Sequence, residues 1–356
     1  FLGVEVMNRA VRGIGYWSFL LCVLLAQQVK ADAQTLVFLN WADYMDPELL
    51  IEFKRQTGIE VKQSYYDSDD NRDQIMATSD GAGYDLILIS GLALEGYLKQ
   101  GWLAQLPNPL SHDVSQIEER WWQAFPGAKA HAVPFFWGTL GIAYRTDLVN
   151  EPITHWKQFF NPGSDLKGKI ALVESAREVL AMALKSLGYS LNTSNKQQFN
   201  EGLALMRQQA PFVGSYNYVD LDETSALLSG ETVAAMMYNG DALMLQEHSD
   251  QIAYVLPSEG GNIWVDYLAI PAKAKNPQAA MAFINFLNKP KQAAQLASYV
   301  YYASPNRGAW PHLSKEFLQD KTIFPGQKSL EQSEFFAPLS PRLLKKLNQA
   351  FQKIVD

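Results

Sequence analysis

Strand and helix patterns alternate along residues 35–99, and this alternation limits the possible folds more than any other feature of the sequence. Runs 35–40, 59–65 and 84–90 are typical of strands, and the last has the unbroken apolar centre of a strand covered on both faces. Helical patterns follow each of these runs. The order predicts an α/β fold in which helices wrap a parallel or mixed sheet.

Polar and aromatic residues lie where two of these strands end. Trp41, Asp43 and Tyr44 follow the first run, and Ser90 ends the third. In α/β sheets, ligands gather beyond the carboxyl ends of the strands. These four residues are therefore candidates for a binding site.

A long apolar run over 134–144 predicts a strand that crosses into a second lobe. Helical and strand-like patterns follow over 153–160 and 169–173. Ser175 and Glu178 then have the spacing of a helix capping box. Glu178 is thus either a helix cap or a candidate site residue.

Another turn from strand to helix, over 231–241, carries an aromatic residue and a carboxylate, Tyr238 and Asp241. Further on, helical patterns lie at 277–287 and 290–299. The chain ends in a pattern typical of an amphipathic helix, over 341–355.

The stretch 259–271 predicts a strand with a glycine turn at its entry. Period two places Trp264 and Asp266 on one face of that strand. A ring face attracts positive charge and a carboxylate pairs with an ammonium group, so the two side chains suit an organic cation. The alternative is a core tryptophan beside an aspartate that caps a turn.

Residues 1–33 are typical of an export leader that starts at Met7. Two arginines precede an apolar run over 14–26, and small residues at 31 and 33 predict a cleavage site. We expect an exported soluble protein, and the alternative is an uncleaved amphipathic anchor. The one cysteine, Cys22, lies in this leader, so the mature chain would have none.

Composition limits the kinds of partner. After the leader about 320 residues remain, which is enough for two domains. The net charge is −7 and no basic run occurs, which argues against nucleic acid or an anionic membrane surface as a partner. The chain has 9 Trp, 16 Tyr and 18 Phe, more rings than a core needs, so some are available to line a cleft.

Metal and enzyme sites are not favoured. The five histidines have no ligand spacing, and the neighbours Tyr301 and Tyr302 would point apart on a strand, so we expect no metal. The carboxylates Asp43, Glu178, Asp241 and Asp266 could form an acid/base pair. The sequence has no Gly-x-Ser-x-Gly motif, no His-Glu-x-x-His motif and no Gly-rich phosphate loop, however. We expect neither an enzyme nor a cofactor.

Many segments resemble one family over essentially the whole mature chain: the periplasmic spermidine/putrescine-binding proteins of polyamine ABC importers. The segments that carry the resemblance are NWADY at 40–44, FKRQTG at 53–58, YDL at 84–86, PFFWG at 134–138, AREV at 176–179, LGYS at 187–190, NG at 239–240, EGG at 259–261, WVDYLAIP at 264–271 and SPN at 304–306. Their common order along the chain makes the resemblance specific.

The resemblance implies a two-lobed periplasmic-binding-protein fold, type II-like, with a mixed sheet and flanking helices in each lobe and hinge crossovers. Lobe 1 would comprise 34–139 and 262–310, and lobe 2 would comprise 140–261 and 311–356. The resemblance also implies a set of ligand-binding residues. The ring wall would be Trp41, Tyr44, Tyr238, Trp264 and Tyr302, the ammonium ligands would be Glu178 and Asp266, and the polar helpers would be Asp43 and Ser90.

The chain departs from the family pattern at three places. Ser175 stands where spermidine binders have an acidic residue, and Leu92 stands where they have an aromatic one. Tyr238 replaces a tryptophan, and Asp241 is a carboxylate that putrescine binders place at this turn. The resemblance therefore implies a polyamine ligand without fixing its length.

Two roles for the ligand stay open. The protein would deliver a spermidine-, putrescine- or norspermidine-type polyamine to an ABC permease, or it would act as a polyamine sensor that docks to a membrane signalling protein of cyclic-nucleotide metabolism. Receptors for sugars or ferric ion share the fold, and the excess of carboxylates argues against a sugar. We expect a monomer.

Overall fold

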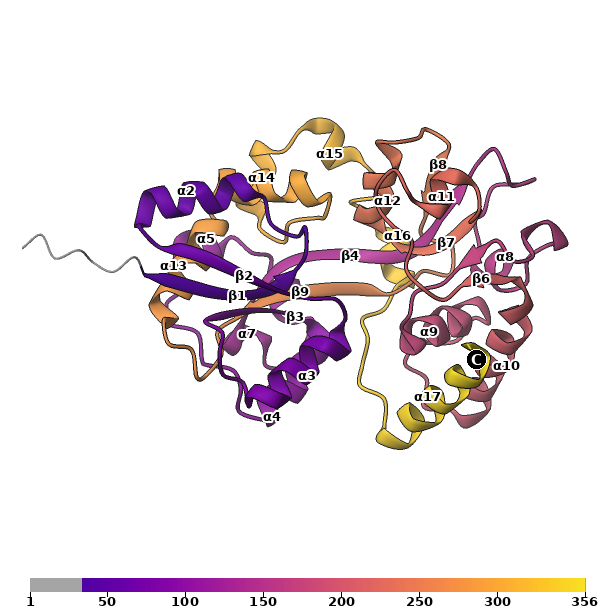
Figure 1. Ribbon diagram of the computed structural model, residues 1–356, viewed down its shortest axis with the longest axis horizontal. Coiled ribbons are helices and arrows are strands. Elements are labelled where there is room, and N and C mark those ends of the chain that lie inside the picture. Colours follow the sequence, from indigo (N-terminus) through magenta and orange to yellow (C-terminus); the bar gives the residue numbers. More distant parts are fainter. Residues whose placement is uncertain (1–33, 356) are drawn as a thin grey trace, which may run out of the picture.

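The computed structural model describes residues 34–355. The predicted leader, residues 1–33, lies outside the described residues. Two lobes lie side by side, and the long strands β4 (Ala132–Arg145) and β9 (Ile263–Ala269) run between them (Figure 1). The chain is thus the two-lobed α/β structure that the sequence predicts.

The strands form a path in the order β2-β1-β3-β9-β4-β7-β5-β6, and β8 also pairs with β4. Their bounds are β1 (Thr35–Trp41), β2 (Glu60–Tyr66), β3 (Leu86–Ser90), β4 (Ala132–Arg145), β5 (Ile170–Ala171), β6 (Val213–Ser215), β7 (Ala234–Tyr238), β8 (Ile252–Val255) and β9 (Ile263–Ala269). β1 is parallel to β2 and β3, whereas β9 is antiparallel to β3 and β4. The prediction of a parallel or mixed sheet is confirmed, and the sheet is mixed.

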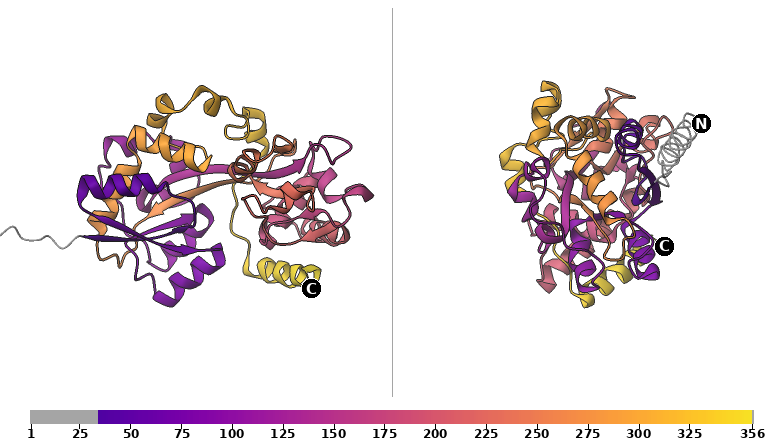
Figure 2. Two further views of the ribbon diagram at one scale, coloured as in Figure 1. Left: turned by 45° about the horizontal axis from the view of Figure 1, so that its top comes forward. Right: turned by 90° about the vertical axis from the view of Figure 1, so that its left-hand side faces the viewer.

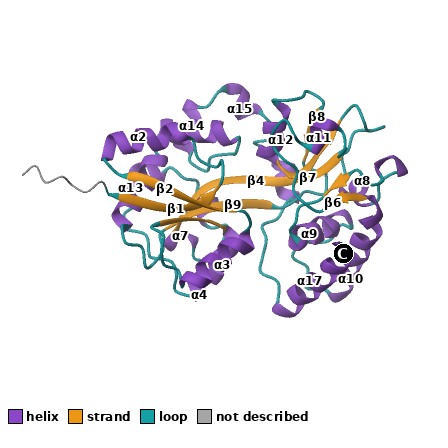
Figure 3. Ribbon diagram, in the orientation of Figure 1, coloured by secondary structure: helices purple, strands orange, loops and turns teal. Residues whose placement is uncertain are grey.

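Helices lie on both sides of the strands in each lobe (Figure 3). The longer helices are α2 (Pro47–Thr57), α3 (Asp69–Ser79), α4 (Leu94–Lys99), α9 (Ala176–Ser186), α10 (Lys196–Gln209), α12 (Asn239–Gln246), α13 (Pro277–Leu287), α14 (Pro290–Val300), α16 (Gln327–Gln332) and α17 (Pro341–Val355). The shorter ones are α5 (His112–Ser115), α6 (Glu119–Trp122), α7 (Ala128–His131), α8 (Trp156–Phe160), α11 (Ala226–Ser229) and α15 (Lys315–Gln319).

The strand β4 belongs to both lobes. Its residues 132–139 pair with β9, and its residues 140–145 pair with β7 and β8. All of its residues are buried except Arg145, which is half-buried, and this explains the unbroken apolar pattern of the sequence. β4 is therefore the crossover that the sequence predicts.

Separate apolar cores fill the two lobes. One contains residues from 36–137 and 263–323 together with Leu243, and the other contains residues from 140–236 together with Leu347 and Ala350 of α17. A smaller third cluster lies between β7, α12 and β8. The predicted lobe boundaries stay a prediction, although Leu313 and Ile323, which they assign to lobe 2, pack in the first core.

The chain crosses between the lobes a third time after α14. It passes through α15 and α16 and reaches α17, which lies against the second lobe (Figures 1 and 2). Within residues 34–355, no helix combines the length and the apolar content needed to cross a bilayer.

Gly260 and Gly58 provide a test of this crossing. Both have a left-handed backbone, with φ of 77° and 75°. A Cβ atom at Gly260 would lie 2.2 Å from the carbonyl oxygen of Gln332, the last residue of α16, whereas one at Gly58 would meet nothing within 4 Å. The turn predicted at Gly260 is thus confirmed, and its backbone lies directly against the third crossover.

We expect Gly58→Ala to lower the free energy of unfolding by about 1 kcal/mol, the strain of a left-handed alanine. Gly260→Ala should cost roughly 1–3 kcal/mol more, because the crossover must move. Urea denaturation of the two variants and the wild type measures both values. Equal destabilisation by the two substitutions would contradict the packing described here.

Candidate functional site

The strand β9 presents Trp264 and Asp266 on one face. Both are half-buried, and they alternate with the buried residues Ile263, Val265 and Tyr267. The predicted shared face is therefore confirmed, and Trp264 is not a fully enclosed core residue. Its indole Nε1 atom has no hydrogen-bond partner among the described residues.

Four of the five rings that the resemblance implies form a continuous group. The ring centroids lie 6.1 Å apart for Tyr238 and Trp264, 4.8 Å for Trp264 and Tyr302, and 5.8 Å for Tyr302 and Tyr44. The interplanar angles of 83°, 83° and 63° are close to edge-to-face. Trp41 instead packs against Tyr66, with 4.4 Å between centroids.

Two glycines allow the rings of Trp264 and Tyr302 to pack directly against the backbone of neighbouring elements. A Cβ atom at Gly138 of β4 would lie 2.5 Å from the Trp264 indole, and one at Gly240 of α12 would lie 2.5 Å from the Tyr302 ring. Real side chains do not approach so closely, so any larger residue would displace the ring above it. Gly138 and Gly240 therefore position the aromatic group.

Asp266 lies next to this aromatic group. Its carboxylate accepts a hydrogen bond from the Tyr44 hydroxyl at 3.2 Å. Burial and the negative charge of Asp69 together raise the pKa of Asp266 to about 7, against the opposing effects of Tyr44 and Arg72. A cation close to Asp266 would favour the ionised carboxylate.

Glu178 occupies the first turn of α9 in the second lobe. Its backbone N–H donates to the Ser175 side chain at 3.4 Å, so Ser175 caps the helix. The Glu178 carboxylate accepts a hydrogen bond from the Tyr238 hydroxyl at 2.9 Å. The side chain of Glu178 is thus directed to the aromatic group, and only its backbone takes part in the cap.

The environment of Glu178 resembles that of Asp266. Burial and the charge of Asp69 together raise the pKa of Glu178 to about 7, while Tyr238, Arg177 and Ser175 oppose the shift. Two carboxylates from different lobes therefore both resist ionisation, and both contact a tyrosine of the aromatic group.

Asp241 lies in the first turn of α12, and each oxygen of its carboxylate accepts a hydrogen bond from a tyrosine hydroxyl. The Tyr218 hydroxyl donates to its Oδ2 at 2.6 Å, and the Tyr302 hydroxyl donates to its Oδ1. Burial raises the pKa of Asp241, and the two tyrosine hydrogen bonds oppose that shift. Asp241 thus fixes two phenol rings, and this contact links α12 to the residues that follow α14.

The two predicted polar helpers differ. Asp43 is exposed and has a left-handed backbone, with φ of 55°. Ser90 donates its hydroxyl to Oδ2 of Asp69 at 2.8 Å. Asp69 was not predicted from the sequence, because Ser68-Asp69-Asp70 has the pattern of an ordinary helix start, and Ser68 does cap α3.

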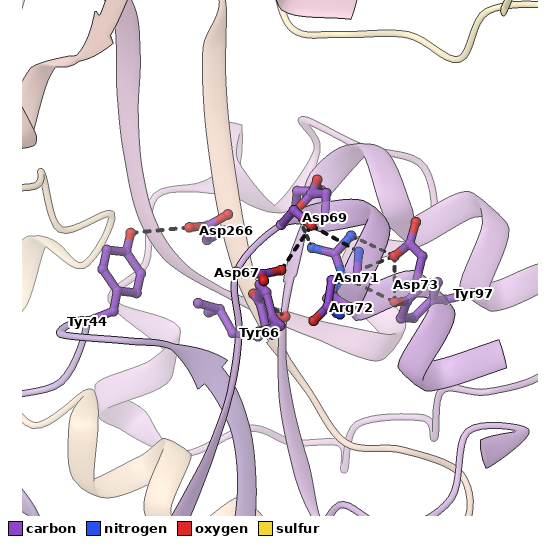
Figure 4. A network of polar contacts seen from close by, with 12 residues as sticks. Tyr44, Tyr66, Asp67, Asp69, Asn71, Arg72, Asp73, Tyr97 and Asp266 are labelled. Carbon is purple, nitrogen blue, oxygen red and sulfur yellow. Dashed lines mark hydrogen bonds and ion pairs between the residues drawn. The ribbon is translucent and has the colours of Figure 1, made fainter. Parts of the chain in front are cut away.

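Arg72 contacts Asp69 (Figure 4). This arginine is 1% exposed, and it donates to Asp69 at 2.6 Å and to Asp73 at 2.8 Å. Asp73 also accepts the Tyr97 hydroxyl at 2.7 Å. Neither Arg72 nor the rings of Tyr66 and Tyr97 beside it were predicted, since their contacts join segments that are distant in the sequence.

The paired tyrosines need a correction. Tyr301 is not on a strand but ends α14 with φ of 57°. Its hydroxyl donates to Glu247, whereas that of Tyr302 donates to Asp241, so the two side chains still have different partners. Within residues 34–355, no group of three or more His, Cys, Asp or Glu side chains is placed to hold a metal ion.

Comparison with known proteins identifies the family. A family model described as bacterial extracellular solute-binding protein matches residues 48–325. The chain belongs to this family. It is 32% identical over 306 residues to the spermidine/putrescine-binding periplasmic protein of Escherichia coli (strain K12), a match that covers 85% of this chain and 87% of the relative.

Two further similarities are informative. The chain is 28% identical over 329 residues to a norspermidine sensor of Vibrio cholerae, covering 91% of this chain and 89% of the sensor. A crystal structure of the spermidine/putrescine ABC transporter substrate-binding protein of Streptococcus pneumoniae, with calcium and HEPES, superposes with a TM-score of 0.79 at 32% identity. It covers 90% of this chain and 98% of that one, which confirms the predicted fold.

The raised pKa values of Asp266 and Glu178 predict a dependence of stability on pH. Unfolded carboxyl groups titrate near pH 4, whereas these two titrate at about 7 in the fold, so the folded chain holds its protons more tightly between these values. We therefore expect the Tm of the protein without ligand to fall as pH rises from about 4 to about 7.

Differential scanning calorimetry at several pH values tests this dependence. The matched control is the double variant Asp266→Asn/Glu178→Gln, which keeps the shapes of the side chains and removes both titrations. Its Tm should fall less steeply over the same interval. Identical pH profiles of the wild type and the double variant would show that these carboxyl groups do not titrate as described.

Proposed function

We propose that this chain is a periplasmic polyamine-binding protein that delivers its ligand to an ABC importer. The observation that carries the proposal is the placement of Trp264 and Asp266 on one strand, near Glu178 and Tyr238 of the other lobe. The names of the relatives from Escherichia coli and Streptococcus pneumoniae support it. Our proposed ligand-binding set consists of ten residues: Trp41, Asp43, Tyr44, Ser90, Glu178, Tyr238, Asp241, Trp264, Asp266 and Tyr302.

The chemistry of the site suits a flexible chain with an ammonium group at each end. Each methylene removed from water contributes about 0.8 kcal/mol, and each cation over a ring contributes roughly 0.5–2 kcal/mol. Asp266 and Glu178 accept from tyrosine hydroxyls, which can be exchanged for ammonium donors that form stronger, charge-assisted hydrogen bonds. We infer that a neutral sugar would leave these carboxylates without a counter-charge.

Binding and closure of the lobes are coupled in this proposal. Glu178 belongs to α9 of the second lobe, and Asp266 belongs to β9, which pairs with β3 of the first. A ligand that pairs with both carboxylates stabilises the arrangement in which they face each other. The closed shape would then be the one that a membrane partner recognises.

A second role is favoured by one specific similarity. The norspermidine sensor of Vibrio cholerae matches 91% of this chain, so the same site could serve a sensor that docks to a membrane signalling protein. Co-purification from detergent-solubilised membranes separates the two roles, because the partner is either an ABC permease or a signalling enzyme. The name of the Escherichia coli relative supports a location in the periplasm, whereas the cleavable leader, the monomeric state and the lack of catalysis remain predictions.

Substitution of Asp266 tests the proposed function. We expect Asp266→Asn to weaken binding of spermidine or putrescine by roughly 2–5 kcal/mol, the scale for removing one partner of a buried charge pair. The matched control is Asp250→Asn, because Asp250 is exposed after α12 and the change in charge is identical. Isothermal titration calorimetry at neutral pH measures both affinities.

The outcomes of this titration are distinct. Asp250→Asn should bind within about threefold of the wild type, since exposed charges are screened by salt. Unchanged affinity in Asp266→Asn would remove this residue from the site. A wild-type protein that binds neutral sugars but no polyamine would overturn the proposed function.

A further inference from the structure

Asp69 lies beside the first of the two proposed ammonium ligands. Ser90 of β3 and Asp266 of β9 are directly paired in the antiparallel register, so their side chains point to the same face of the sheet. The Ser90 hydroxyl donates to Oδ2 of Asp69 at 2.8 Å. The carboxylate of Asp69 is thereby held on the face that carries Asp266 and Trp264.

The charge of Asp69 is not fully compensated. Arg72 is the cation that contacts it, and Arg72 is shared with Asp73, which accepts from both Nε and Nη2. The side chains of Asp69 and Asp73 are each 48% exposed, whereas that of Arg72 is 1% exposed. One guanidinium with two carboxylates leaves one negative charge, and it lies on carboxylates that are about half exposed.

Asp69 also has room for another donor. A carboxylate offers about four acceptor positions. Arg72 donates to Oδ1 and Ser90 donates to Oδ2, so about two positions remain available. Both bonds hold the carboxylate in one orientation, which lowers the entropy lost when a further group binds.

The field of Asp69 reaches both proposed ends of the ligand. Its charge raises the pKa of Asp266 and also that of Glu178 in the other lobe. The hydrogen bond from Ser90 and the pairing of Ser90 with Asp266 place Asp69 near Asp266 on the same face of the sheet. A third carboxylate near the site suits a third positive charge on the ligand.

Resting on the polyamine-binding function proposed above, we propose that Asp69 binds the internal secondary ammonium group of a triamine, while Asp266 and Glu178 bind its terminal groups. Asp69 then selects a triamine over a diamine of equal length. In a bound diamine, a methylene group would lie at this point. The Asp69 carboxylate would then lose water without gaining a hydrogen bond from the ligand, and this free-energy penalty would disfavour the diamine.

Two ligands of matched length isolate this contact. Spermidine and 1,8-diaminooctane have equal chain length, and they differ by one internal ammonium group that is replaced by a methylene. We expect the wild-type protein to bind spermidine at least about tenfold more tightly, the scale of one hydrogen bond to a charged group. Isothermal titration calorimetry with each ligand gives this ratio.

The decisive variant is Asp69→Asn, and Asp70→Asn is its matched control. Asp70 is the next residue of α3, it is exposed, and the substitution removes the same charge. Asp69→Asn should bring the ratio of affinities to within about threefold, through weaker binding of spermidine, while its affinity for 1,8-diaminooctane stays near the wild-type value. That unchanged affinity also shows that the variant is folded. Asp70→Asn should keep the wild-type ratio.

Three results would overturn this inference. The ratio could survive in Asp69→Asn, which would exclude the contact. Asp70→Asn could lose the ratio equally, which would assign the preference to the general negative field of α3. A wild-type protein that binds neither amine would refute the polyamine-binding function itself, and this result differs from the first two because both of those require binding by the wild type.

Discussion

The site depends on carboxylates that are shielded from water and that have too few cations to pair with. Among the described residues, Asp266, Glu178 and Asp241 form no ion pair, and each accepts hydrogen bonds from tyrosine hydroxyls. Such groups either hold protons or attract a cation, because an isolated charge in this environment is costly. In the proposed function, these carboxylates are therefore what favours a cation over a neutral ligand.

The scaffold places these groups by sharing strands between the lobes. β4 extends from the strands of one lobe into those of the other, and β9 lies beside its first half, so Trp264 and Asp266 lie close to the junction. Gly138 and Gly240 then leave space for two rings directly on the backbone. A movement of one lobe would change the separation of Asp266 and Glu178, so the proposed binding would be coupled to a hinge.

Part of this arrangement could be predicted from the sequence, because it depends on local patterns. Period two fixes the common face of Trp264 and Asp266, and alternating strands and helices fix the class of fold. The family resemblance added Glu178, for which spacing alone left a helix cap equally possible. Asp69 could not be found in this way, since a helix start explains its sequence and its contact with Ser90 joins residues distant in the chain.

A crystal structure of the protein grown with spermidine tests the central claim most directly, because it shows where the charges and the methylenes of the ligand lie. Our account predicts one terminal nitrogen about 3 Å from Asp266 and the other about 3 Å from Glu178, with the methylenes against the ring of Trp264. Spermidine bound elsewhere, or bound between the lobes without contact to either carboxylate, would contradict it.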